Sequence, residues 1–292
     1  MAAADRFSVA GRRAIVTGAS YGLGTTMAKG LADAGAKVAL VARSADKLEL
    51  VAKEIEAEGH EAVVIPCDIG QPEQIKAMVQ EAWDRLGRVD ILVNNAGVSA
   101  EAGMMPERVP DEVFAQTVQV NLNGTFTCCR EVGGRMLADG QGGSIINIAS
   151  IAGMGGTHHF PPAYQATKAA VINLTRNLAA SWATRGVRVN AVAPGWFPSE
   201  MTGPWFAVPQ FLERFSGMAP MNRVGDPDEL TGAIIFLASD AASFVTGQTL
   251  AVDGGLSAVA GSFDYTPELF EMVEMVMGES GKRILPDEVD EG

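Results

Sequence analysis

Short runs of apolar, β-branched residues alternate with longer amphipathic stretches along most of the chain. The runs are apolar almost throughout, which is typical of strands that helices cover on both faces. We expect strands at Ala14–Thr17, Val38–Val41, Ala62–Ile65, Ile91–Val93, Ser144–Ile148, Val187–Val192 and Thr249–Val252. We expect helices at Gly24–Ala34, Ala45–Glu58, Pro72–Leu86, Asp111–Leu137, Tyr164–Thr184 and Pro227–Leu237. This alternation predicts an α/β fold, a doubly wound and mostly parallel sheet of seven strands with helices on both faces.

Two stretches depart from the alternation. Residues 196–222 hold two of the four tryptophans and four of the twelve phenylalanines, and they predict a long aromatic flap. The end of the chain is acidic and carries an apolar stripe at helical spacing over residues 267–277. We therefore expect one domain over residues 1–262 and an acidic C-terminal extension with a short amphipathic helix over residues 263–292.

Charge and composition narrow the classes of protein. The 292 residues carry a formal net charge of −13, and an acidic surface repels phosphate backbones and anionic lipid headgroups. No apolar run approaches the roughly 20 residues that cross a bilayer, and the N-terminus offers no signal-peptide core. Three cysteines, two of them adjacent, build no disulfide framework. We expect a cytoplasmic protein that binds neither nucleic acid nor membrane.

The first expected strand runs directly into a glycine-rich turn, and a helix follows. Gly18, Gly22 and Gly24 have the spacing G-x-x-x-G-x-G, which differs from the standard dinucleotide fingerprint. In a strand–turn–helix unit, backbone N–H groups and the positive end of the helix approach a pyrophosphate. Cβ atoms at these glycines would obstruct the turn, the ligand or the helix packing. The turn predicts a dinucleotide-phosphate site.

The end of the second expected strand indicates which dinucleotide fits. NAD-type sites place an acid there for the ribose 2′-hydroxyl, whereas a 2′-phosphate needs a cation. Ala42 occupies the acid position, Arg43 follows, and Lys47 lies one helical turn further on. A planar guanidinium suits a phosphate dianion, so NADP(H) is favoured, with NAD(H) as the alternative. Asp68 is a candidate acceptor for an adenine amino group, and Asn95 a candidate stabiliser of the turn beside the cofactor.

Tyr164 and Lys168 are four residues apart in an expected helix and therefore share one face. The phenol of tyrosine has an ordinary pKa of about 10, which is too high for efficient proton exchange near neutrality. A neighbouring ammonium favours the phenolate and lowers that pKa. The pair is a candidate acid/base unit for a carbonyl or alcohol oxygen.

Together these elements resemble the short-chain dehydrogenase/reductase family. In chain order, the matching motifs are Thr17–Gly24, Asn94–Gly97, Asn121, Ser150, Tyr164–Lys168 and Pro194-Gly195. The resemblance runs from about residue 10 to residue 255. It implies a Rossmann-type domain, an NAD(P)-dependent alcohol or ketone oxidoreductase, and a homotetramer.

The resemblance also implies roles for single residues. Tyr164 would donate the proton in reduction and accept it in oxidation, while Lys168 would hold the nicotinamide ribose and lower the pKa of Tyr164. Ser150 would hydrogen-bond the reacting oxygen, and Asn121 would anchor a water in a proton relay that reaches Lys168. The residues expected at the cofactor are Gly18, Ser20, Tyr21, Gly22, Leu23, Arg43, Asp68, Ile69, Asn95, Tyr164, Lys168, Pro194, Gly195 and Ser199.

The sequence departs from the family pattern at several points. The interval from Ser150 to Tyr164 is one residue longer than the family commonly shows, and it contains His158-His159. Adjacent histidines point in different directions on most backbones, so we predict no metal site. Their role is open between lining the substrate pocket and simple exposure. Tyr21 stands where NADP-preferring relatives often have Lys or Arg, which weakens the preference for NADP(H).

The expected function is hydride transfer between a nicotinamide cofactor and a carbonyl or secondary alcohol. The four-residue Tyr–Lys spacing argues against the enoyl-reductase branch. Alternatives are an NAD-dependent sugar-acid or polyol dehydrogenase, because the start of the flap resembles members such as gluconate 5-dehydrogenase, and a ketoacyl-thioester reductase. A dinucleotide sensor without enzymatic activity is a further alternative. The flap aromatics are candidates for walls of the substrate site, or else pack on the body or on a neighbouring subunit.

Overall fold

A seven-stranded sheet forms the centre of the computed structural model, which describes residues 4–156 and 161–258. Every adjacent pair of strands is parallel, so the sheet is parallel throughout rather than mostly parallel. The strand order is β3-β2-β1-β4-β5-β6-β7, which is the Rossmann-type order. The strands are β1 (Arg13–Thr17), β2 (Lys37–Ala42), β3 (Ala62–Pro66), β4 (Ile91–Asn94), β5 (Gly143–Ile148), β6 (Val187–Pro194) and β7 (Thr249–Val252).

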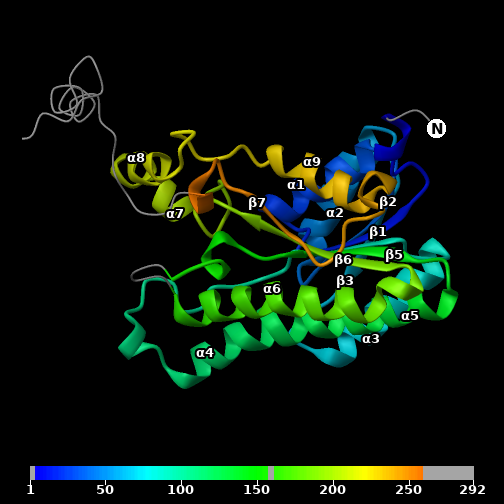
Figure 1. Cartoon of the computed structure of the whole chain (residues 1–292), viewed down its shortest axis with the longest axis horizontal. Coiled ribbons are helices and arrows are strands. Elements are labelled where there is room, and N and C mark those ends of the chain that lie inside the picture. The colour runs from blue at the N-terminus through cyan, green and yellow to red at the C-terminus, as the bar shows by residue number, and fades with distance from the viewer. Residues whose placement is uncertain (1–3, 157–160, 259–292) are drawn as a thin grey trace, which may run out of the picture. The chain divides into compact units, whose positions relative to one another are not determined.

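Helices cover both faces of the sheet (Figure 1). One layer consists of α1 (Gly22–Asp33), α2 (Ala45–Ala57) and α9 (Glu229–Ala238), and its apolar side chains share one core cluster with alternate residues of the strands. The opposite layer consists of α3 (Pro72–Leu86), α4 (Asp111–Val118), α5 (Thr125–Asp139) and α6 (Pro162–Trp182). Buried side chains of α3, α5 and α6 form the second main cluster with the other face of the sheet. Because both faces are buried, the central strands are apolar at most positions.

The strand order reverses between β1 and β4, which pair with each other while their connecting helices lie on opposite faces. At such a switch point the loops that leave the carboxyl ends of the two strands diverge, and a crevice opens between them. The glycine-rich turn leaves β1 at this point, and the motif that begins at Asn94 leaves β4. The topology therefore brings both motifs to one crevice.

The single helix expected over Asp111–Leu137 is interrupted, so that prediction was wrong in its centre. The structure contains α4, one turn of π-helix at Gln119–Gly124 (η3), and then α5. Single turns of π-helix within α-helices are frequently found at functional sites. Gly124 allows this turn to lie close to the backbone of Ile69, because a Cβ atom at position 124 would lie 2.5 Å from the carbonyl oxygen of Ile69. The apolar periodicity on either side gives no sign of the extra residue in this turn.

Residues 196–222 contain two short helices, α7 (Gly203–Phe206) and α8 (Pro209–Met218), which Figure 1 shows beyond the end of the sheet. Their aromatic rings pack on one another. Trp196 and Phe206 lie against the ring of Phe215, with centroids 4.1 and 5.7 Å apart, and Trp205 meets Phe211 edge to face at 5.6 Å. Most flap aromatics therefore contact each other rather than a ligand site.

The remaining short helices connect these elements: η1 (Ala4–Phe7), η2 (Pro106–Arg108), η4 (Ile151–Gly153), η5 (Ala183–Arg185), η6 (Asp240–Ala242) and η7 (Leu256–Ala258). One compact unit extends to Ser257. The extension predicted at 263–292, with its helix, and His158-His159 lie outside the described residues. None of the helices within the described ranges has both the length and the apolar composition that a bilayer-spanning segment requires.

Candidate active site

A pocket of about 430 Å³ opens at the carboxyl ends of β1, β4, β5 and β6. With one exception, every residue expected at the cofactor or in catalysis lines this pocket. The exception is Asn121, which lies buried behind the wall at 1% exposure. Segments that are far apart in the sequence thus meet at the carboxyl ends of these strands.

The glycine-rich turn after β1 depends on the absence of side chains. Gly18 has a φ of +68°, and a Cβ atom there would lie 2.8 Å from the Cα atom of Ala96. A Cβ atom on Gly24 would overlap the carbonyl oxygen of Gly18. The side chain of Asn95 fastens the turn from β4, because its Nδ2 donates to the carbonyl oxygens of Thr17 at 3.0 Å and Gly18 at 3.2 Å.

The first turn of α1 faces the pocket with its backbone amides. The residue before the helix, Tyr21, is extended, and its side chain does not cap the helix. The N–H groups of a first helical turn have no partner within the helix and attract an anion. Gly22, at a φ of +57°, leaves open space beside this turn, since its nearest neighbour would be the Ser199 side chain at 3.7 Å from an added Cβ. The cradle fits the pyrophosphate of a dinucleotide.

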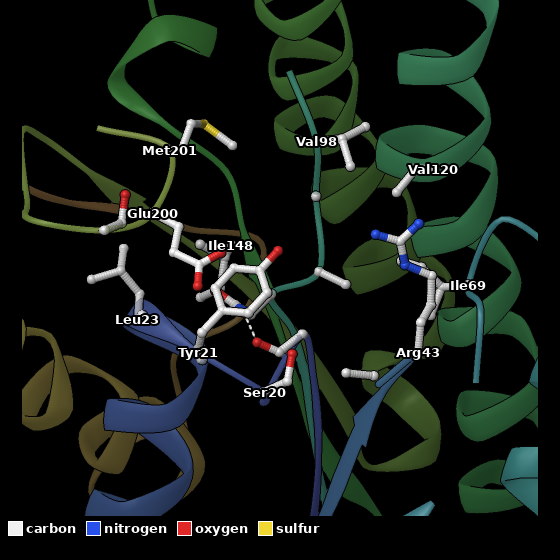
Figure 2. Close-up of a pocket in the computed structure, with 18 of the residues that line it drawn as sticks. Ser20, Tyr21, Leu23, Arg43, Ile69, Val98, Val120, Ile148, Glu200 and Met201 are labelled. Carbon is white, nitrogen blue, oxygen red and sulfur yellow. Dashed lines mark hydrogen bonds between the residues drawn. The ribbon is translucent and has the colours of Figure 1, made fainter. Parts of the chain in front are cut away.

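Two groups of side chains flank the mouth of the pocket (Figure 2). Arg43, exposed at the end of β2, lies beside Ile69, whereas Tyr21 and Glu200 lie together across the pocket from it. Lys47 joins the second group, with its Nζ 5.2 Å from the centroid of the Tyr21 ring and 3.8 Å from Glu200 Oε1. Arg43 is therefore placed to meet a phosphate at this end, while Lys47 turns towards Glu200.

The remaining expected cofactor residues line the walls between the turn and the reactive end. Asp68 is partly buried and accepts the N–H of Gly70 at its Oδ1, at 2.9 Å. Gly195 follows β6 where a Cβ atom would lie 2.7 Å from the Cα of Asp253. The hydroxyl groups of Ser199 and Thr202 lie 3.0 Å apart and fold the start of the flap into a compact turn.

Tyr164, Lys168 and Ser150 meet at the inner end of the pocket. The Nζ of Lys168 lies 5.5 Å from the centroid of the Tyr164 ring and donates to the carbonyl oxygen of Ile148 at 2.7 Å. Lys168 is only 5% exposed, and burial lowers the pKa of its ammonium to about 8. Ser150 Oγ accepts the N–H of Ala152 at 3.1 Å and forms a hydrogen bond with the phenol of Tyr164.

The pKa of Tyr164 moves in the direction opposite to the expectation. Burial raises the pKa of the phenol above its ordinary value of 10, and the hydrogen bond with Ser150 lowers it by less. The positive charge of Lys168 does not reverse this direction. The protein's own groups thus favour the protonated phenol, and a lower pKa would require further positive charge in the pocket.

Asn121 holds a backbone segment in place. Its Oδ1 accepts the N–H of Val98 at 2.8 Å, and its Nδ2 donates to the carbonyl oxygen of the same residue at 2.8 Å. An added Cβ on Gly97 would lie 3.3 Å from Asn121 Oδ1 and 3.6 Å from Lys168 Nζ, so all three groups are close neighbours. The π-helical turn carries Asn121 to this position.

Sequence reasoning missed several residues of the pocket, among them Val98, Gln116, Glu200, Met201 and Thr202. Their types are common and their local motifs weak, so only the spacing of Ser199 and Thr202, which suits a hydroxyl-closed turn, offered a signal. Of the flap aromatics, Phe197 alone appears in the described lining, and it is 4% exposed and packs into the core.

Several known proteins are similar to this chain in sequence and fold. A protein-family model described as Enoyl-(Acyl carrier protein) reductase matches residues 18–257. Gluconate 5-dehydrogenase of Gluconobacter oxydans is 39% identical over 253 residues, which cover 87% of this chain and 97% of that protein. The 3-oxoacyl-[acyl-carrier-protein] reductase FabG of Staphylococcus epidermidis is 40% identical over 248 residues, which cover 84% of this chain and 98% of that protein. The crystal structure of a gluconate 5-dehydrogenase from Burkholderia cenocepacia, in complex with NADP and tartrate, matches with a TM-score of 0.84 and 39% identity over 89% of this chain and 100% of that chain.

Proposed function

The chain belongs to the short-chain dehydrogenase/reductase family and is an NAD(P)-dependent oxidoreductase, and from this premise we propose that it transfers a hydride between NADP(H) and a ketone or secondary alcohol, with Tyr164 as the acid/base. The observation that carries the proposal is the meeting of Tyr164, Ser150 and Lys168 at one end of a pocket whose other end is the glycine-rich cradle.

Each side chain has a defined task in the proposed reaction. Bound NADP(H) supplies the hydride in reduction or accepts it in oxidation. Tyr164 donates its phenolic proton to the carbonyl oxygen in reduction and takes a proton from the hydroxyl in oxidation. The hydroxyl of Ser150 donates to the same oxygen and stabilises the charge that develops there. Lys168 places an ammonium beside the ring, and Asn121 keeps the segment at Val98 aligned with it.

The direction of the Tyr164 pKa supports reduction at neutral pH. A phenol whose pKa is raised stays protonated below pH 10 and is ready to donate. Oxidation needs the phenolate as acceptor, so its rate should increase with pH. Lys168, with a pKa of about 8, retains its charge at neutral pH and loses it as the pH rises through that value.

NADP(H) is favoured over NAD(H) because of the cation at the end of β2. Arg43 is exposed at the pocket mouth, and Ala42 stands where an NAD-type site has an acid. A charge-assisted contact from a guanidinium to the 2′-phosphate is among the stronger hydrogen bonds in proteins. NADP is also the cofactor named for the Burkholderia cenocepacia relative.

Charge in the pocket guides the choice of substrate class. Within the described lining, the cationic side chains are Arg43, at the cofactor mouth, and Lys168, beside Tyr164. A sugar acid would need a further cation for its carboxylate, so we expect an uncharged ketone or polyol to be preferred. The spacing of Tyr164 and Lys168 argues against reduction of an enoyl double bond.

A substrate panel tests the proposal. Uncharged ketones, polyols, sugar acids and a 3-oxoacyl thioester are each incubated with NADPH and with NADH, and the absorbance of the reduced nicotinamide is followed. Tyr164→Phe should lower kcat for the best substrate by about 100- to 10,000-fold, the usual contribution of general acid–base catalysis, with NADPH binding still measurable. Near-normal turnover by this variant would refute the role of Tyr164.

A further inference from the structure

Glu101 is a fully buried acidic residue that no sequence motif singled out. It lies in the loop after β4 at 0% exposure. Among the described residues, each oxygen of its carboxyl group has a partner: the hydroxyl of Thr117 donates to Oε2 at 2.6 Å, and the backbone N–H of Tyr164 donates to Oε1 at 2.7 Å. The second partner is the amide of the proposed acid/base residue itself.

Within the described residues, the helix that carries Tyr164 has no capping side chain at its N-cap position. Helix α6 begins at Pro162, and the residue before it, Pro161, has no side-chain group that could accept a hydrogen bond. Tyr164 is the third residue of the helix, the position whose N–H a capping side chain usually accepts. Glu101 supplies this acceptor from 63 residues earlier in the chain. A carboxylate is also favourable at the positive end of a helix.

Thr117 connects the same carboxyl group to the other wall of the site. It is fully buried on α4, and its hydroxyl accepts the N–H of Ala100 at 3.3 Å while it donates to Glu101. Helix α4 runs directly into the π-helical turn that carries Asn121. Glu101 therefore lies where the loop after β4, the helix that leads to Asn121 and the start of α6 converge.

Glu101 does not line the pocket, and its carboxyl group has no exposed surface. It is therefore not placed to exchange a proton with a substrate. We propose that Glu101 is a positioning residue, which orients the first turn of α6 so that the phenol of Tyr164 meets the reacting oxygen. This inference rests on the proposed function in that it takes Tyr164 as the acid/base.

Three substitutions separate positioning from bulk stability. Glu101→Gln keeps an acceptor for the Tyr164 N–H and can pair its amide with Thr117, so kcat should stay within about threefold of the unsubstituted enzyme. Glu101→Ala removes the acceptor and should lower kcat by about 10- to 100-fold, since small misplacements of a catalytic group have effects of this size. Glu107→Ala, at an exposed position of the same loop, is the matched control and should be unchanged.

Comparing kcat with the dissociation constant of NADPH distinguishes a positioning role from a general loss of structure. The dissociation constant of NADPH, measured by fluorescence titration, should stay within about twofold in every variant, because Glu101 bonds to Thr117 and Tyr164 and does not line the pocket. The loss in Glu101→Ala should thus fall on kcat. Equal losses of kcat and NADPH affinity, or a Glu101→Gln variant as impaired as Glu101→Ala, would overturn the proposal.

A double-substitution cycle distinguishes failure of this inference from failure of the proposed function. In the Tyr164→Phe background, Glu101→Ala should reduce the residual kcat by less than about twofold, because the residue through which it acts is already lost. A further tenfold loss would show that Glu101 acts by another route and would overturn positioning of Tyr164. Full activity of Tyr164→Phe alone would instead refute the proposed function.

Discussion

Replacement of Lys168 by methionine is expected to stabilise the cofactor-free protein at neutral pH and to remove most of its activity. The ammonium is buried, and this burial lowers its pKa from the ordinary 10.5 to about 8. At neutral pH the folded protein therefore holds a charge that has lost most of its hydration, with a hydrogen bond to the carbonyl oxygen of Ile148 as partial compensation. Methionine has a similar length and no charge.

The sign and size of the effect follow from counting protons. The lysine of the unfolded chain keeps its proton up to about pH 10.5, and that of the folded protein up to about pH 8. Between these values the unfolded chain binds more protons, so the free energy of unfolding of the unsubstituted protein rises with pH. At about 1.4 kcal/mol per pKa unit, the full window corresponds to about 3 kcal/mol. Loss of the hydrogen bond to Ile148 costs the variant about 1 kcal/mol at every pH.

Lys168→Met should therefore be about 2 kcal/mol more stable than the unsubstituted protein at pH 7, and this advantage should vanish near pH 10. Urea unfolding of cofactor-free protein, followed by tryptophan fluorescence at equal protein concentration, measures both values. Lys53→Met, at an exposed position of α2, is the control and should show no such pH-dependent difference.

The change of the stability difference between pH 7 and pH 10 is the decisive measurement, because contributions that do not titrate are equal at both pH values and cancel. A stability difference of the same size at pH 7 and pH 10 would refute the reasoning, whatever its sign. Activity of Lys168→Met should fall by orders of magnitude under conditions in which the variant is fully folded. A variant with nearly normal turnover would show that the buried charge serves no catalytic purpose.

Two further predictions concern the cofactor end. Arg43→Ser should weaken NADPH binding by about 10- to 100-fold, the size of a charge-assisted contact, and leave NADH binding within about twofold. Both affinities can be measured by fluorescence titration. Equal losses for NADPH and NADH would show that Arg43 does not contact the 2′-phosphate. Gly24→Ala should lower the Tm and abolish cofactor binding, because the added methyl group overlaps the Gly18 carbonyl. Gly134→Ala, in open space on α5, is the control and should raise the free energy of unfolding by about 0.5–1 kcal/mol. An unchanged Tm in Gly24→Ala would contradict the described turn.

The strands were predictable because burial on both faces leaves a direct mark on the sequence. All seven expected strands occur, and the main differences are at their ends. Strands β1 and β2 begin one residue earlier than expected, at Arg13 and Lys37, which face each other in the parallel register. A polar residue at the first position of a strand carries no apolar signal, so a pattern of hydrophobic residues places the boundary after it.

The site was predictable as far as its residues belong to local motifs. The glycine-rich turn and the Tyr164–Lys168 pair each have a spacing with a physical meaning, Ser150 was expected from the family resemblance, and all line one pocket. The π-helical turn at Asn121 was not predictable, because the hydrogen bonds that hold this side chain run to Val98, 23 positions earlier. The direction of the Tyr164 pKa depends on burial, which no spacing reveals.

The polar side chains buried beside the pocket share one kind of partner. Lys168, Glu101 and Asn121 are all almost fully buried, so each would be costly without hydrogen bonds. Each bonds to main-chain groups: a carbonyl at the end of β5, an amide in the first turn of α6, and both groups of a residue after β4. Main-chain groups are present whatever the local sequence, so the fold alone decides whether these side chains meet them. Because the three contacts join three different segments around Tyr164, loss of any one should displace the phenol relative to the substrate without removing it. The effects on turnover should then exceed those on cofactor affinity, since the cradle for the pyrophosphate is formed by other residues.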